Sequence, residues 1–182
     1  MTRSNIAAIV GAESTLIQKL LAQAIVDWRA EGLNICGIVE EAHGLTGRSC
    51  SAGLLRNIQT NNVYAMYLDE PPAHTSCHLD ELGVVGACSS VLGQIEESDI
   101  VVLSKFGKVE AVGSGLFEAF EHAIASGKPV LTSVAPKHHY AWTRFAPDAM
   151  FIRPERAAFD EWLDRARQHM APGFRASVSL HR

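Results

Sequence analysis

The sequence predicts a three-layer α/β fold with a mostly parallel sheet and an inserted β-hairpin. Apolar runs such as Ile6 to Val10 and Ile100 to Leu103 have the continuous hydrophobicity of strands that are buried on both faces. Segments with apolar residues three and four positions apart alternate with these runs, as in amphipathic helices. Strands that alternate with helices form parallel units in which helices cover the sheet.

The first strand–helix–strand unit is predicted between residues 6 and 39. Strand Ile6 to Val10 leads into a helix whose apolar stripe includes Leu21 and Trp28. Gly32 suits the left-handed conformation that follows a helix end, so the helix is expected to stop just before it. Leu33 to Val39 is then the second strand.

A hairpin is predicted at about residues 53–68. Its strands run from Gly53 to Gln59 and from Val63 to Leu68, and the turn contains Asn61 and Asn62. Asparagine tolerates the positive φ angles that tight hairpin turns require. Two prolines, Pro71 and Pro72, close the unit. The hairpin is therefore an insertion into the α/β pattern.

The second half of the chain continues the alternation. Asp80 is the expected N-cap of a helix that reaches about Glu97. Further strands are predicted at 100–103, at KPVLTSV and at 150–152. Further helices are predicted at about 116–125, at 139–145, and after Pro154, which suits a first helical turn.

Composition places the chain among ordinary globular proteins and bounds its partners. Residues 1–171 are expected to form one domain, and residues 172–182 a flexible tail. A net charge of −4 and a pI of about 6.0 favour no nucleic acid partner. No apolar run has the ~20 residues that cross a bilayer, so a cytoplasmic protein without membrane contact is expected. Composition leaves both a monomer and a homo-oligomer open.

The turn after the first strand lies where nucleotide-binding proteins hold phosphate. It reads Gly11, Ala12, Glu13, Ser14 and Thr15. A standard phosphate loop is about four residues longer and carries a lysine. Free N–H groups at the helix N-terminus can still hold a small anion. The plainer interpretation, which we favour against hydrolysis, is a strand–helix turn with Ser14 as the cap.

The stretch LSKFGKVEAVGSGLFEAF favours an anion site. Lys105 and Lys108 flank Gly107 just beyond a buried strand, and the glycine–serine turn 113–115 opens the next helix. Ammonium groups beside free N–H groups attract anions. Glu110 is expected to orient a lysine, bind a metal or cap the turn. The alternative, equally weighted, is that the lysines are solvated and the glycines only permit a tight connection.

Two histidine-containing stretches are weaker candidates. The stretch SVAPKHHYAW carries Lys137, and its histidines, His138 and His139, are expected to lie at the surface, although either could contact a ligand. A thiolate–imidazole metal site is the less favoured interpretation of a second group, for which an interior thiol beside a helix cap is commoner. The residues of that group are Cys50, His74, Cys77 and His78.

Four stretches together resemble a bacterial family called domain of unknown function 2478, from about residue 5 to residue 165. They are SCSAGLLRNI, TSCHLDELGVVGAC, SDIVVLSKFGKVEAVGSGL and AIASGKPVLTSV. Members are often encoded near molybdate-transport or molybdenum-enzyme genes, so the resemblance implies a molybdenum context. The family in turn is similar to thermophile-type nucleoside-triphosphatases. These have a complete phosphate loop, a hairpin after the second strand, and the acidic stretch Asp-Glu-Ile-Gly-x-Met-Glu.

Against that acidic stretch, this chain reads from Ser104 to Glu110, so serine and lysine replace the two acids. The resemblance therefore implies a degenerate site, because magnesium and triphosphate need acids and a loop lysine. We expect a non-hydrolytic protein that binds phosphate, molybdate or a nucleotide without magnesium. Its expected ligand-binding residues are Lys105, Gly107, Lys108, Gly113, Ser114 and Gly115, with Gly11, Ser14 and Thr15 opposite.

Three other functions remain open from the sequence. One is an active nucleoside-triphosphatase with a non-standard site, in which Glu110 or Glu13 acts on water. Another is a protein-interaction or regulatory module that uses the hairpin from Gly53 to Leu68 as its contact surface. The third is a cysteine-based metal carrier, for which the four cysteine and histidine residues above are the candidates.

Overall fold

The computed structural model describes residues 4–42, 53–66 and 80–169. Their strands form one seven-stranded sheet in the order β4-β3-β2-β5-β6-β1-β7. Five strands are parallel: β1 (Ile6–Ile9), β2 (Ile35–Glu41), β5 (Ile100–Leu103), β6 (Val130–Ser133) and β7 (Met150–Ile152). The predicted α/β class with a mostly parallel sheet is confirmed.

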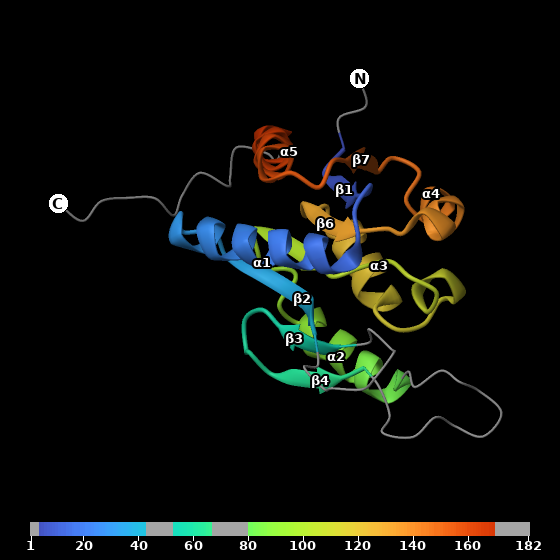
Figure 1. The fold of residues 1–182 in the computed structure, drawn as a ribbon. Helices are drawn as coiled ribbons and strands as arrows, with labels where there is room; N and C mark the ends of the chain where they lie inside the picture. Colours follow the sequence, from blue (N-terminus) through green and yellow to red (C-terminus); the bar gives the residue numbers. More distant parts are fainter. Residues whose placement is uncertain (1–3, 43–52, 67–79, 170–182) are drawn as a thin grey trace.

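Helices cover both faces of the sheet. Figure 1 shows α1 (Ser14–Ala30) and α5 (Arg156–His169) on one side, and α2 (Glu81–Leu92), α3 (Phe117–Ala125) and α4 (His139–Phe145) on the other. Alternate strand residues feed two apolar cores: Ile9 packs with the α1 and α5 side, and Ala8 with the α2 and α3 side. Burial on both faces explains why the strands are largely apolar, although β6 also buries Thr132 and Ser133.

The inserted hairpin extends the β2 edge of the sheet. Strands β3 (Leu54–Asn57) and β4 (Val63–Ala65) are antiparallel, and β3 pairs with β2. Asn61 has a φ of 60°, as predicted for the turn. Helix α2 packs closely on the hairpin, because a Cβ on Gly83 would lie 1.8 Å from the carbonyl oxygen of Ala65. Glycine at this position therefore lets the helix approach the strand backbone.

Helix ends were predicted with mixed success. The Asp80 carboxylate accepts hydrogen bonds from the N–H groups of Leu82 and Gly83, so the predicted N-cap is confirmed. Helix α2, expected to reach Glu97, ends at Leu92, and the chain continues in turns from Gly93. Glycine is a poor helix former, which favours this early end. Gly32 has the expected positive φ, 90°, just past α1.

Two further expectations about helix starts were wrong. Ser14 is the first residue of α1 and not its cap; Glu13 occupies the N-cap position without a side-chain hydrogen bond. Helix α5 begins at Arg156, two positions after Pro154.

In the described parts of the chain, no helix has the length and apolar character needed to cross a bilayer. The predicted tail 172–182 and the Pro71–Pro72 pair lie outside the described residues.

Candidate anion-binding cavity

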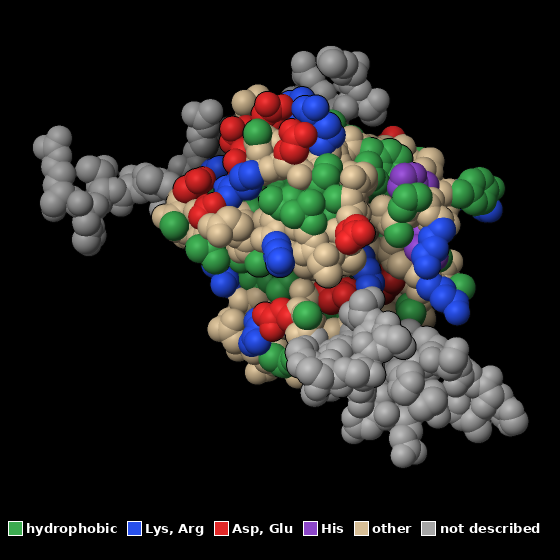
Figure 2. All heavy atoms as spheres, viewed as in Figure 1, with side chains coloured by type: hydrophobic (Ala, Val, Ile, Leu, Met, Phe, Trp, Pro, Cys, Tyr) green, Lys and Arg blue, Asp and Glu red, His purple; other side chains and the backbone are tan. Residues whose placement is uncertain are grey.

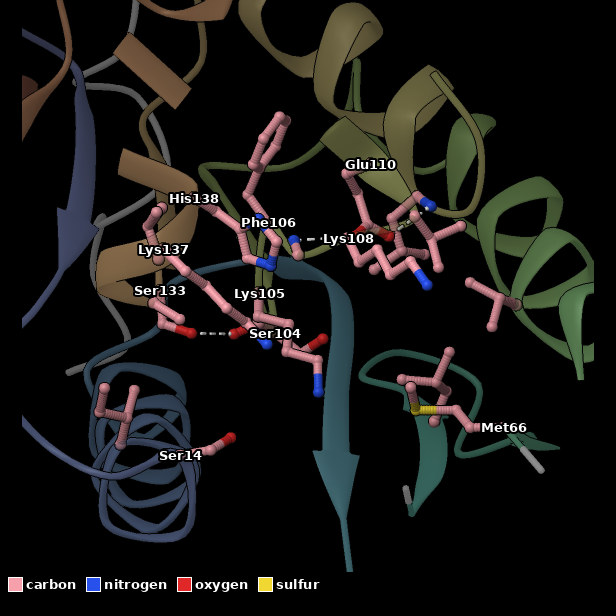
Figure 3. Close-up of a pocket in the computed structure, with 18 of the residues that line it drawn as sticks. Ser14, Met66, Ser104, Lys105, Phe106, Lys108, Glu110, Ser133, Lys137 and His138 are labelled. Atoms are coloured by element: carbon pink, nitrogen blue, oxygen red, sulfur yellow. Dashed lines mark hydrogen bonds between the residues drawn. The ribbon is translucent and has the colours of Figure 1, made fainter. Parts of the chain in front are cut away.

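A cavity of about 460 Å³ lies beyond the C-terminal ends of β5 and β6. Helix α1 and the hairpin form its other walls (Figure 3). This is the sheet edge at which parallel α/β proteins bind ligands. Four basic side chains line the cavity: Lys105, Lys108, Lys137 and His138. Figure 2 shows Lys or Arg and His side chains gathered on the side of the molecule that carries α4.

The loop after β5 is anchored by Phe106, which is 2% exposed. Its N–H donates to the carbonyl oxygen of Ser133 at 2.9 Å, which extends the contact between β5 and β6. The ring packs edge-on against Trp142 with centroids 5.1 Å apart. Burial of this ring fixes the backbone on which Lys105 and Lys108 sit, so both lysines project from a rigid segment into the cavity.

Glu110 holds the same loop together from inside. Its side chain accepts hydrogen bonds from the N–H of Gly107 at 2.9 Å and from the N–H of Leu116 at 3.1 Å. The residue is only 6% exposed. A buried carboxylate needs such partners, and here each of its oxygens has one. Of the three roles expected for Glu110, the structure shows the structural one, a cap of the turn.

The glycine–serine turn does not face the cavity. The N–H of Gly113 donates to the carbonyl oxygen of Glu110, and the N–H of Ser114 to that of Val109, so these donors close the turn. Gly115 is buried with a φ of 64°, and a Cβ there would lie 2.6 Å from Glu110 Oε1. The cavity wall does not include Gly113, Ser114 or Gly115. These three residues support the lysine-bearing loop instead of presenting N–H groups to a ligand.

Lys105 forms an ion pair that the sequence did not reveal. Its Nζ lies 2.7 Å from Glu40 Oε2, and the Glu40 side chain is 9% exposed. Gln18 of α1 connects β2 to the end of β5. Its side-chain N–H group donates to the carbonyl oxygen of Ser104, and its side-chain oxygen accepts from the N–H of Glu40. Polar residues in apolar settings were the available signal: Gln18 lies on the buried face of α1, and Glu40 ends the apolar run of β2.

The loop after β6 contributes more than expected. Lys137 and His138 line the cavity, whereas the sequence favoured an ordinary surface position for the histidine. Partial burial, together with the positive charge of Lys137, lowers the pKa of His138 below its usual value, and Glu110 opposes this shift. His139 points elsewhere and packs against Phe151, with ring centroids 5.0 Å apart. The two adjacent histidines therefore have different surroundings.

The opening turn contributes one predicted residue. Ser14 lines the cavity together with Ala12, whereas Gly11 and Thr15 do not. Gly11 has a φ of 92°, and a Cβ there would point toward the ring of Pro154, 4.0 Å away. Only residues 10–13 separate β1 from α1, so the turn is short, as the sequence predicted. Figure 3 shows Ser14 across the cavity from the lysine-bearing loops.

Among the residues that the structure describes, the charge balance of the cavity wall is positive. The one carboxylate in this part of the wall is Glu110, which is committed to the two N–H groups of its loop. Within residues 4–42, 53–66 and 80–169, neither Lys108 nor Lys137 forms an ion pair. Such a wall attracts anions, because several lysine side chains line one concave space.

The predicted cysteine–histidine metal site lies outside the described residues. Its candidates are Cys50, His74, Cys77 and His78. Among the residues that the structure does describe, no group of three histidine, cysteine, aspartate or glutamate side chains is placed to hold a metal ion. Cys36 and Cys88 are free and buried, and burial raises the pKa of both thiols. Both therefore behave as small core residues, as their positions in apolar runs suggest.

Comparison with known proteins identifies the family. The model of the family "Protein of unknown function (DUF2478)" matches residues 6–162, so the chain belongs to this family. The chain is also 32% identical, over 162 residues, to the molybdenum import ATP-binding protein ModC 2 of Bradyrhizobium diazoefficiens. That match covers 87% of this chain but only 18% of the relative. No solved structure gives a significant match.

Proposed function

We propose that this DUF2478 protein binds an oxyanion, or the phosphate end of a nucleotide, in the cavity beyond β5 and β6, without magnesium and without hydrolysing it. The observation that carries the proposal is the wall itself. Lys105, Lys108 and Lys137 face one space, and Glu110, the carboxylate among the lining residues, is bonded to backbone N–H groups. Charge-assisted hydrogen bonds from lysine to oxyanions are among the stronger polar contacts in proteins.

The carboxylates near the cavity support the absence of magnesium. Mg²⁺ binds through one or two carboxylates and completes its shell with waters and phosphate oxygens. Glu40 is paired with Lys105, and Glu110 is bonded to Gly107 and Leu116. Recruiting either carboxylate would break contacts that hold the loop after β5. The same contacts oppose the alternative in which Glu110 acts as a general base on water.

The opening turn supports a degenerate phosphate loop. It spans residues 10–13 and carries no lysine, so the ammonium groups in the cavity come from the loops after β5 and β6. In our proposal Lys105, Lys108, Lys137 and His138 contact the anion, and Ser14 contributes its hydroxyl from the opposite side. Gly107 lines the cavity, and its N–H is already bonded to the carboxylate of Glu110.

The physiological setting that we propose is molybdenum handling in the cytoplasm. Its support is the similarity to a molybdenum import ATP-binding protein, with which this chain shares 32% identity. The resemblance to a family encoded near molybdenum genes points the same way. Molybdate is a tetrahedral oxyanion, so the lysine-lined wall suits it on the same grounds as phosphate.

The proposal is tested by isothermal titration calorimetry with phosphate, molybdate, tungstate, sulfate, ATP and GTP. Each titration is run with magnesium and with EDTA. We expect at least one anion to bind, with affinity that does not require magnesium and that falls as salt is added. Binding only in the presence of magnesium, or release of phosphate from ATP or GTP that Lys105→Ala abolishes, would overturn the proposal and favour the triphosphatase.

Alanine variants of the lining lysines test whether the anion binds in this cavity. Lys108→Ala and Lys137→Ala each remove one lining ammonium group, and we expect about a tenfold or greater loss of affinity for each. Lys19→Ala is the matched control, because Lys19 is exposed on α1 and does not line the cavity. Equal losses in all three variants would show a general charge effect and no site.

A further inference from the structure

The cavity has two chemically different halves. The basic side chains lie at the ends of β5 and β6, whereas apolar side chains from the hairpin and α2 face them (Figure 3). Met66 lies on the far side of the cavity from Lys137 and Ser133. Apolar atoms form most of the wall. An inorganic oxyanion would use only the basic half, so the apolar half calls for a separate explanation.

We propose that the ligand is an organic phosphate whose apolar, ring-sized body occupies the half lined by Leu55, Met66 and Val84, while its phosphate faces the lysines. This inference rests on the proposed function, because it places the anionic group of the ligand on the same lysines. It goes further by naming the chemical class. Free phosphate, molybdate and sulfate would contact the basic half alone and would bind less tightly than such an organic phosphate.

The side chains of the apolar half come from ordered elements of the fold. Leu55 comes from β3, Met66 from the residue after β4, and Val84 from the first turns of α2. All three belong to the apolar core between the sheet and α2. Met66 is held in place by main-chain bonds, since its N–H donates to Gly53 and its carbonyl oxygen accepts from Asp80. This wall is therefore a preformed surface.

Size supports the same conclusion. At ~30 Å³ for each water, a cavity of about 460 Å³ holds roughly 15 water volumes, far more than one tetrahedral oxyanion displaces. Small-molecule sites usually measure about 300–1,000 Å³, are mostly apolar, and carry a few polar groups that fix orientation. Here the lysines would orient the phosphate, and the apolar wall would supply contact area to the rest of the molecule.

The test is a ligand series of constant charge and increasing apolar area. Methyl phosphate, phenyl phosphate and 1-naphthyl phosphate are titrated into the whole protein by calorimetry, with inorganic phosphate and benzyl alcohol as references. If the rings are buried, affinity should rise by up to about tenfold for roughly every 55 Å² of apolar ligand surface that is covered. We expect phenyl phosphate to bind more tightly than methyl phosphate by about fivefold or more.

A matched pair of variants locates the effect. Val84→Phe fills the apolar half and should abolish the gain in affinity from methyl to phenyl phosphate. Val85→Phe is the control, because the neighbouring Val85 is 46% exposed and does not line the cavity. If Val84→Phe lowers the unfolding midpoint, Val109→Phe, at a partly buried lining position, is measured in its place.

The outcomes separate this inference from the proposed function. If methyl and phenyl phosphate differ by less than about fivefold while Lys137→Ala still weakens inorganic phosphate, the organic body is refuted and the anion site stands. If no member of the series binds, or binding is indifferent to Lys137→Ala, both fail. A gain with ring size that Val84→Phe or Val109→Phe leaves intact would also overturn the inference.

Discussion

Replacing Gly115 with alanine tests whether the loop after β5 depends on the buried Glu110 carboxylate. Gly115 has a φ of 64°, in the left-handed region that disfavours side chains. A Cβ there would lie 2.6 Å from Glu110 Oε1 and 2.9 Å from Val109 Cγ1. The carboxylate cannot keep its position against such a contact, so the hydrogen bond from the N–H of Leu116 is expected to break.

The expected loss of stability has two parts. Left-handed backbone costs a residue other than glycine about 1–2 kcal/mol. Loss of a hydrogen bond to a charged group adds about 1.5–3 kcal/mol. Gly115→Ala should therefore lower the free energy of unfolding by about 2.5–5 kcal/mol. Gly113→Ala is the matched control, because Gly113 has a φ of 79° but no atom within 4 Å of the position that a Cβ would take. Gly113→Ala should lower the free energy of unfolding by the backbone part alone, about 1–2 kcal/mol.

Urea denaturation followed by circular dichroism measures both variants. The slope of the unfolding free energy against urea concentration should be unchanged, so that a shift in midpoint reports stability. Equal destabilisation of Gly115→Ala and Gly113→Ala would refute the reasoning, because it would leave only backbone strain. A Gly115→Ala protein with phosphate affinity intact would equally contradict the link between Glu110 and the placement of Lys105 and Lys108.

Single contacts give three further predictions. Glu40→Gln should raise phosphate affinity by about two- to fivefold, because it releases Lys105 from its ion pair; calorimetry showing unchanged or weaker binding would contradict this. His138, whose pKa is lowered in the folded protein, stabilises the fold above its usual pKa of about 6.5, and that stability is lost as the pH falls through the lowered folded value. Urea midpoints across pH 4–8 should therefore fall less steeply in His138→Gln, and identical profiles would refute the assignment. Asp80→Ala removes the cap of α2 and should cost about 1 kcal/mol in the same assay, whereas Asp80→Asn should retain most of it, since asparagine also caps helices; equal loss in both would show that the cap contributes little.

The sequence predicted those parts of the fold that depend on local chemistry. Apolar runs located the parallel strands, because strands buried on both faces consist mostly of apolar residues. Asn61 and Gly32 marked a hairpin turn and a helix end, because each position requires a positive φ. The early end of α2 escaped prediction, because Ile95, four positions after Val91, continues a helical spacing that Gly93 interrupts.

The candidate site was predictable only in part, because its contacts join distant segments. Lys105 and Lys108 follow a buried strand, so the sequence placed them at the ligand-binding edge. The partner of Lys105, Glu40, became evident only when the sheet order set β2 beside β5. Lys137 joins the site because β6 lies on the other side of β5. No spacing along the chain contains this information.

The three lysines that line the cavity repel one another, and a bound anion would remove part of this electrostatic cost. Glu40 offsets the charge of Lys105 alone. The loop nevertheless keeps its shape, because Phe106 is buried among aromatic rings and Glu110 is bonded at both oxygens. Stability of the loop is thus supplied by apolar packing and a buried carboxylate, which leaves the lysine charges available for an anion.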